Sequence, residues 1–210
     1  GLGRVEESLA SCDQALALDP DCAEAFNNRG NALRHLGRNL EALASYDRAV
    51  AVKSDFAEAF YNRANTLRDL RRDDDALKSV HLALALRPSY LEALNWRAVV
   101  LRGLKRNDEA MACVERALAI DPGYSEALHN NGNWLMMSER YAEAAENFER
   151  LLHADPEWEY ALGQLVYCRA HMCDWRDSTA KAAELTARVR AGKRAVTPFP
   201  MLAISNSAPD

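Results

Sequence analysis

The chain has 210 residues, of which 49% are hydrophobic, and its formal net charge is −5. Acidic and basic residues are interspersed, which argues against nucleic acid as the partner. We find no apolar run long enough to span a bilayer and no signal peptide, so we expect a cytoplasmic protein without a membrane partner.

Residues 1–22 are predicted to form the second helix of an incomplete repeat. They match a later helix in register: Gly3, Ser8, Cys12 and Ala15 fall where Gly37, Ala42, Tyr46 and Ala49 fall in the next copy. Repeat arrays usually end in a helix with a polar outer face. An unpaired, partly apolar helix at this end therefore indicates that the chain is part of a longer one.

Four complete copies of a 34-residue repeat follow in residues 23–156, with starts at Ala23, Ala57, Leu91 and Ser125. Counted from these starts, the eighth position is always small: Gly30, Ala64, Ala98 and Gly132. The twentieth position is always alanine: Ala42, Ala76, Ala110 and Ala144. Small residues at both positions let the two helices of one copy approach closely. Proline ends most copies because it cannot continue a helix.

The helices expected from this pattern come in pairs. First helices are predicted near 23–36, 57–70, 91–104 and 125–138, and second helices near 40–53, 74–87, 108–120 and 141–154. Asn39, Asp73 and Asn107 precede three of the second helices, where a short polar side chain can cap the free N–H groups.

A fixed period of 34 residues with two amphipathic helices per copy resembles the tetratricopeptide repeat family. The resemblance implies an all-α fold in which helix pairs stack into a right-handed superhelix, or α–α solenoid. One pair cannot bury both of its faces, so neighbouring copies complete the core. The concave face of such an array would present partner proteins or extended peptides.

After Pro156 the repeat weakens. A fifth first helix is predicted from Glu157 to about Met172, and Asp177 is predicted to cap a further helix that ends near Ala191, with Gly192 as its stop. We interpret residues 157–192 as a degenerate fifth repeat with a capping helix. Residues 193–210 contain three prolines and no helical period, so we expect an extended tail there.

The C-terminal residues resemble a second family, the bacterial-type O-linked GlcNAc transferases. The match to the segment that joins their repeats to their catalytic region is carried by Cys173, Asp174, Trp175 and Asp177, followed by Val196, Pro198, Phe199, Met201 and Leu202. The resemblance implies that this chain is the recognition arm of a UDP-GlcNAc-dependent protein glycosyltransferase. The catalytic residues of that family have no counterpart here, so we expect no enzymatic activity from this chain.

Polar residues recur at the sixth and ninth positions of the first helices, on the predicted concave face. The predicted peptide-binding residues are Asn28, Asn31, Asn62, Asn65, Trp96, Asn130, Asn133 and Gln164. An asparagine amide has two donor hydrogens and an acceptor oxygen, so a ladder of asparagines can hold a peptide backbone without reading its side chains. In the GlcNAc transferases an asparagine ladder at the sixth position plays this part, and Asn28, Asn62 and Asn130 match it.

Two structural alternatives remain open for these residues. The asparagine amides could be solvated or could pack against the next repeat, although asparagine is a poor residue for a helix interior. Trp96 could pack within the array instead of anchoring a partner.

No cofactor or metal is expected. Five cysteines, an odd number at irregular spacings, indicate buried thiols in a reducing compartment. Cys168, His171 and Cys173 lie close in the sequence, but their spacing does not match a metal site and a fourth ligand is not evident. No nucleophile–base set, phosphate loop or dinucleotide motif occurs.

The sequence therefore predicts a protein- or peptide-binding module, with the recognition arm of a glycosyltransferase as the first hypothesis. The alternative is a stand-alone scaffold, in which the groove or the open N-terminal helix mediates oligomerisation or complex assembly.

Overall fold

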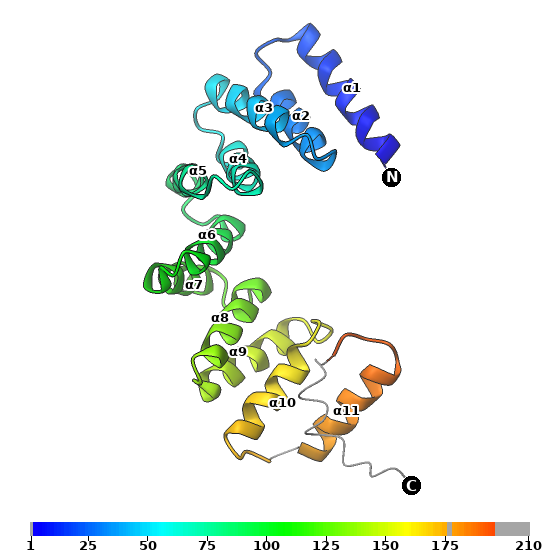
Figure 1. Ribbon diagram of the computed structural model, residues 1–210, viewed down its shortest axis with the longest axis vertical. Coiled ribbons are helices and arrows are strands. Elements are labelled where there is room, and N and C mark those ends of the chain that lie inside the picture. The colour runs from blue at the N-terminus through cyan, green and yellow to red at the C-terminus, as the bar shows by residue number, and fades with distance from the viewer. Residues whose placement is uncertain (1, 176–177, 196–210) are drawn as a thin grey trace. The chain divides into compact units, whose positions relative to one another are not determined.

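The computed structural model describes residues 2–175 and 178–195, and within them every regular element is a helix (Figure 1). The predicted all-α fold is therefore confirmed. The chain divides into two compact parts, Gly1–Ala110 and Met111–Asp210, which we call the N-terminal part and the C-terminal part. Among the described helices, none combines the length and apolar character that a bilayer crossing requires.

The N-terminal part contains helices that pack on their neighbours in chain order. They are α1 (Leu2–Leu18), α2 (Ala23–His35), α3 (Asn39–Val52), α4 (Ala57–Asp69), α5 (Asp73–Leu86) and α6 (Leu91–Gly103). Helix α7 (Asn107–Ile120) begins in this part and ends in the next. In the four complete repeats, each predicted helix boundary lies within one residue of the observed one.

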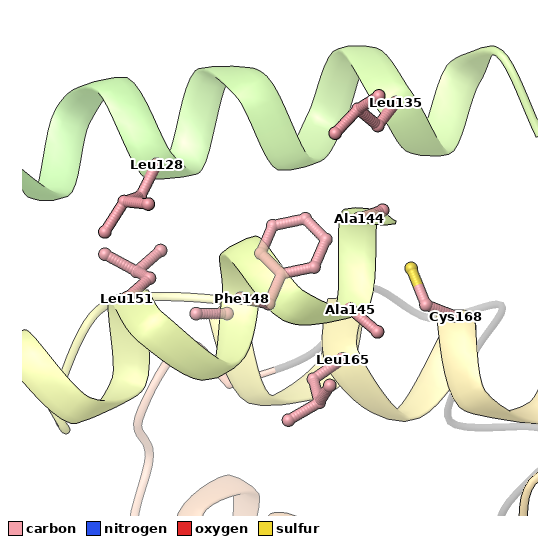
Figure 2. Close-up of a cluster of buried hydrophobic side chains, with 9 residues drawn as sticks. Leu128, Leu135, Ala144, Ala145, Phe148, Leu151, Leu165 and Cys168 are labelled. Carbon is pink, nitrogen blue, oxygen red and sulfur yellow. The ribbon is translucent and has the colours of Figure 1, made fainter. Parts of the chain in front are cut away.

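The C-terminal part continues with α8 (Ser125–Met137), α9 (Tyr141–Ala154), α10 (Ala161–His171) and α11 (Ser178–Arg190). Its core is a layer of leucines and alanines around one aromatic ring. Figure 2 shows Phe148 of α9 pointing toward α8, with Leu165 and Cys168 of α10 on the other side of α9. Phe148 and Cys168 are both fully buried.

The close approach of the two helices in a repeat depends on a pair of positions, the eighth and the twenty-fourth. A Cβ atom on Gly30 would lie 2.6 Å from Cε1 of Tyr46, and one on Gly132 would lie 2.8 Å from Cε1 of Phe148. Where the eighth residue is alanine, the twenty-fourth is the smaller valine, as in Ala64 and Val80 or Ala98 and Val114. All these side chains are fully buried. A large residue at one position therefore requires a small one at the other.

The turn between the two helices uses a left-handed residue at the fifteenth position. Gly37 has a φ of 74°, and the corresponding Arg71, Lys105, Glu139 and Cys173 have φ values between 55° and 61°. The backbone bonds fit a Schellman motif, because Gly37 N–H donates to the Arg34 carbonyl and Arg38 N–H to the Leu33 carbonyl, both at 2.9 Å. Cys173 keeps the 34-residue spacing, so the fifth helix pair turns at the expected residue.

The predicted caps of the second helices are wrong at two positions. Asn39 and Asp73 are the first residues of α3 and α5, and the N-cap residues are Arg38 and Arg72, which make no side-chain cap hydrogen bond. The arginine side chain instead pairs with an acid in the first turn: Arg38 Nη2 lies 2.6 Å from Glu41 Oε2, and Arg72 Nη2 lies 2.7 Å from Asp75 Oδ2. The acid still benefits from the helix dipole.

Helix α10 begins at Ala161 and not at the predicted Glu157. Tyr160 adopts a φ of 65°, which ends the preceding turn, and its N–H donates to the Arg194 carbonyl at 2.8 Å. Gly163 N–H donates to the Ala195 carbonyl at 3.1 Å. One N–H in the first turn of α10 and the N–H of the residue before it are thus satisfied by residues that follow α11, which the local sequence could not reveal.

Helix α11 covers α10, because Leu185 and Ala195 form a buried cluster with Leu162. The helix ends at Arg190, and Gly192 has the left-handed φ of 74° expected of a helix stop. Of the predicted extended tail, residues 193–195 lie against α10. The predicted cap Asp177 and the rest of the tail, residues 196–210, lie outside the described residues.

Arginine at the seventh position joins adjacent repeats in the N-terminal part. Arg29 Nε donates to Asp13 Oδ1 at 2.7 Å, and its Nη1 donates to Ser45 Oγ at 2.8 Å. In the next repeat Arg63 binds Asp47 Oδ1 and Ser79 Oγ, both at 2.6 Å. Each arginine therefore bridges an aspartate of the preceding repeat to a serine of its own repeat.

We expect Gly30→Ala to lower the free energy of unfolding by about 1–3 kcal/mol, the usual cost of overpacking a core. The added methyl group would overlap the Tyr46 ring. Urea unfolding followed by circular dichroism measures the change. Gly103→Ala is the matched control, because a Cβ there meets nothing within 4 Å.

The double variant Gly30→Ala with Tyr46→Val recreates the pair found in the second repeat. We expect it to be more stable than the sum of the single changes, with a coupling of about 0.5–3 kcal/mol. Additive effects in this double-mutant cycle would show that the two positions do not constrain each other.

Candidate functional site

A groove of about 1100 Å³ lies between α1 and α2. In the complete first repeat, Ala42, Tyr46 and Ala49 of α3 are fully buried. Their counterparts on α1 are more open, since Ser8 is exposed and Cys12 and Ala15 are only half-buried. These three residues form one wall of the groove. No described helix covers this face of α1 in the way that α2 covers α3.

Asn28 and Asn31 of α2 form the opposite wall of the groove. Asn28 is exposed and makes no hydrogen bond within the described residues. Asn31 is half-buried, and its Oδ1 accepts a hydrogen bond from the Tyr46 hydroxyl at 2.7 Å. Burial raises the pKa of Tyr46 to about 12, so the phenol keeps its proton and holds the Asn31 amide at neutral pH.

The next two predicted site residues, Asn62 and Asn65, already have hydrogen-bond partners in the structure. Asn62 Nδ2 donates to Asn27 Oδ1 at 3.0 Å, and Asn27 Nδ2 lies 3.5 Å from Glu58 Oε1. Asn65 is only 8% exposed and donates to the Tyr61 carbonyl at 3.1 Å. These amides already join α2 to α4 or pair within α4.

Asn27, at the fifth position of its repeat, is not among the predicted peptide-binding residues. It is 2% exposed, and its amide links the first repeat to the second. A buried asparagine needs a hydrogen-bond partner, and here the partner is the neighbouring asparagine at the sixth position. The available signal was the pair of adjacent asparagines, Asn27 and Asn28, of which one faces the next repeat and the other the groove.

Trp96 is packed inside the N-terminal part. Its side chain is 6% exposed, and the Arg68 guanidinium lies 5.4 Å from the ring centre. The contact distance fits a cation–π interaction. The indole Nε1 is buried without a hydrogen-bond partner among the described residues. The position of Trp96 matches the packing alternative.

In the C-terminal part, two of the predicted residues bind each other. Gln164 Nε2 donates to Asn133 Oδ1 at 2.5 Å, and Asn133 Nδ2 lies 3.0 Å from His129 Nε2. Burial lowers the pKa of His129, so the ring is neutral at pH 7 and Nε2 can accept from the Asn133 amide. Gln164 Oε1 is buried and finds no hydrogen-bond partner in the part of the chain that the structure describes. Asn130 lies half-buried on the same helix, α8.

The structure thus separates the predicted residues into two kinds. Asn28 and Asn31 line an open groove, whereas Asn62, Asn65, Asn133 and Gln164 bind other side chains or the backbone. Contact between any of these residues and a peptide stays a prediction.

The cysteine and histidine residues that lie close together in the fifth repeat have different surroundings. Cys168 is fully buried in the core of the C-terminal part, and burial raises the pKa of its thiol to about 12. His171 stacks on Tyr141 at 4.4 Å, and Cys173 is exposed in the turn. All five cysteine thiols are free, and within the described residues no group of acids, cysteines and histidines could hold a metal ion.

Comparison with known proteins identifies the repeat. A family model of the tetratricopeptide repeat matches residues 1–58 and 61–125. None of the curated proteins matches the chain.

Solved structures with the same fold cover most of the chain. Pseudomonas aeruginosa pilF is 17% identical, with a TM-score of 0.78 over 96% of this chain and 89% of its own. PilW, a type IV pilus biogenesis factor, is 20% identical, with a TM-score of 0.74 over 95% of this chain and 90% of its own. YrrB, described as having an unusual peptide-binding site, is 21% identical, with a TM-score of 0.64 over 82% of this chain and 89% of its own.

At these identities the solved structures show the fold alone, and they leave the resemblance to O-linked GlcNAc transferases as an expectation. The matched residues cover more than half of the chain, and the repeat, its helix pairs and its turn agree with them. The chain belongs to the tetratricopeptide repeat family.

Proposed function

We propose that the chain binds an extended peptide segment of a partner protein in the groove between α1 and α2. The observation that carries the proposal is the open face of α1 opposite the exposed amide of Asn28. The repeat family supports a binding role, and YrrB is a repeat protein of the same fold with a peptide-binding site.

The chemistry of the two walls fits a peptide. Cys12 and Ala15 offer apolar contact, and Ser8 offers a hydroxyl on the same wall. Asn28 provides a donor pair and an acceptor for a peptide N–H and C=O. Hydrogen bonds to the peptide backbone give little selectivity for the peptide sequence, and the small residues of the wall leave room for the peptide side chains.

We expect random linear peptides displayed on phage to be captured by the purified chain. Asn28→Ala should lower the affinity for the captured peptides by about fivefold to tenfold, because one or two hydrogen bonds are lost. Fluorescence polarisation with a captured peptide measures the change. Gln14→Ala is the matched control, since Gln14 is also an exposed carboxamide but lies outside the groove. Equal loss in both variants, or no capture, would argue against this groove.

The second candidate function is a scaffold that associates with itself or with other subunits through the uncovered face of α1. Leu18, at the end of α1, is 89% exposed, and Ala15 on the groove wall is half-buried. A second molecule could cover these apolar groups.

If the scaffold function is right, static light scattering should show an average mass that rises with concentration. Ala15→Glu should reduce this rise, because it places a charge in the contact. A chain that stays monomeric at high concentration would contradict the scaffold function and would leave peptide binding untouched.

A finer proposal concerns the protein in which this module works, and it rests on the resemblance to the GlcNAc transferases. Cys173 occupies the fifth turn, and Trp175 after it is 64% exposed, so the described part of the resembling segment is accessible to a partner or a further domain. Free thiols support the expected cytoplasmic compartment.

We expect the isolated chain to bind protein substrates but to transfer no sugar from UDP-GlcNAc. An antibody against this chain should detect a source protein several tens of kilodaltons larger than the chain, and that protein should transfer sugar in a direct assay. Transfer by the isolated chain would contradict its role as a binding arm, and a source protein of about the chain's own 23.4 kDa would contradict the transferase.

A further inference from the structure

The arginine at the seventh position has a carboxylate partner in two repeats but not in the third. Arg29 and Arg63 each bind an aspartate from the twenty-fifth position of the preceding repeat and a serine from the twenty-third position of their own. Arg97 occupies the same seventh position. It makes no hydrogen bond or ion pair to another residue in the described part of the chain.

The cause is a change of three residues at this junction. His81 stands where Asp13 and Asp47 stand in the earlier junctions, and Cys113 stands where Ser45 and Ser79 stand. Lys78 replaces the alanines Ala10 and Ala44. The junction has therefore lost an anion next to the guanidinium and gained a cation one helical turn away.

A pocket of about 590 Å³ opens at this place, between α5, α6 and the residue before α7. Its polar lining consists of Lys78, His81, Arg97, Arg106 and the single acid Asp74. Its apolar lining is Leu77, Leu82 and Leu101. Lys78 pairs with Asp75 at 3.2 Å, and Arg106 pairs with Glu109 at 2.6 Å. Among the lining lysine and arginines, Arg97 is therefore the one without an ion pair in the described part of the chain. Its charge acts on Glu109 only at longer range, where it adds to the Arg106 hydrogen bond in lowering the pKa of that carboxyl.

We propose that this pocket binds the carboxylate of an aspartate or glutamate side chain of a partner protein, flanked by an apolar residue. The carboxylate takes the place that Asp13 and Asp47 hold beside Arg29 and Arg63, and the leucines receive the flanking residue. The proposal extends the proposed protein-binding function to a second site, made of residues that the α1–α2 groove does not use.

A carboxylate is the group that the equivalent arginines bind in the two preceding junctions. The two preceding junctions show that a carboxylate fits this arginine fork at 2.6 and 2.7 Å. An ionised pair of this kind forms stronger hydrogen bonds than neutral groups. The pocket is open, and three of its lining residues are leucines, which suits a peptide side chain and its apolar neighbour better than a free hydrated ion. Its volume lies in the usual range of about 300–1,000 Å³ for small-ligand sites.

The test uses a short fluorescent amidated peptide with one aspartate between leucines, and the same peptide with asparagine in its place. We expect the aspartate peptide to bind with one copy per chain, and the asparagine peptide to bind about tenfold more weakly. Arg97→Gln should cause a similar loss. Added salt should weaken binding of the aspartate peptide, because the pocket is open to solvent and salt screens the attraction between exposed charges.

Two substitutions, each of which gives one junction the residue found in another, make the test specific to this pocket. His81→Asp supplies the missing carboxylate from within the chain, so it should abolish peptide binding while the thermal midpoint stays equal or rises. Asp47→His removes the carboxylate beside Arg63, so it should create a second site and raise the stoichiometry from one to two. Asn28→Ala should change neither result, which separates this pocket from the groove.

Other outcomes would overturn the proposal. Equal binding of the two peptides, unchanged affinity in His81→Asp, or no binding of the aspartate peptide would each exclude a carboxylate site at Arg97. Inorganic phosphate that binds in an Arg97-dependent way, while the peptide does not, would replace it with a phosphate site. If no peptide binds in the α1–α2 groove but the aspartate peptide binds as expected, the pocket beside Arg97 is a binding site independent of the groove.

Discussion

The contact between the eighth and twenty-fourth positions sets how closely the two helices of a repeat can pack. In the first and fourth repeats an aromatic ring fills the space above a glycine, and in the second and third the sequence has alanine and valine at these two positions. The combined volume of the two side chains is roughly the same in each repeat, because a close-packed interior tolerates neither overlap nor a void. The turn follows from the same constraint, since helices this close need a short connection, and the left-handed fifteenth residue provides it.

Polar side chains connect one repeat to the next, and this use competes with binding a partner. Asn62 and Arg63 lie on the same helix, and both are occupied by residues of the preceding repeat. A group becomes available only where its neighbour is missing or altered. The groove beside Asn28 is lined by the half-open face of α1, and the pocket beside Arg97 is lined by His81, which stands where the earlier repeats have an aspartate. Candidate binding sites in this chain are therefore the exceptions to its own repeat.

Sequence periodicity predicted most of the fold but only part of the candidate site. The predicted helix boundaries in the four complete repeats lie within one residue of the observed ones. The pattern of small and apolar positions depends on local packing, and it recurs in all four repeats. The predicted start of α10 was wrong because Tyr160 takes a left-handed φ just before the helix, and its N–H donates to Arg194. Within the helix Gly163 N–H donates to Ala195, and both acceptors lie more than thirty residues away in the sequence. The caps were wrong because a side-chain pair, Arg38 with Glu41, was preferred to a cap by Asn39.

The sequence by itself determined the family, the order and limits of the repeated helices, and the residue types that recur on each helix. It did so because a 34-residue period fixes which residues share a face. Only the tertiary structure decided which asparagines are hydrogen-bonded to other residues and which is exposed, that Trp96 is buried, and that Arg97 makes no ion pair within the described residues. These properties depend on what the adjacent repeat places opposite each side chain, and the same residue type at the same position meets a different neighbour in each copy.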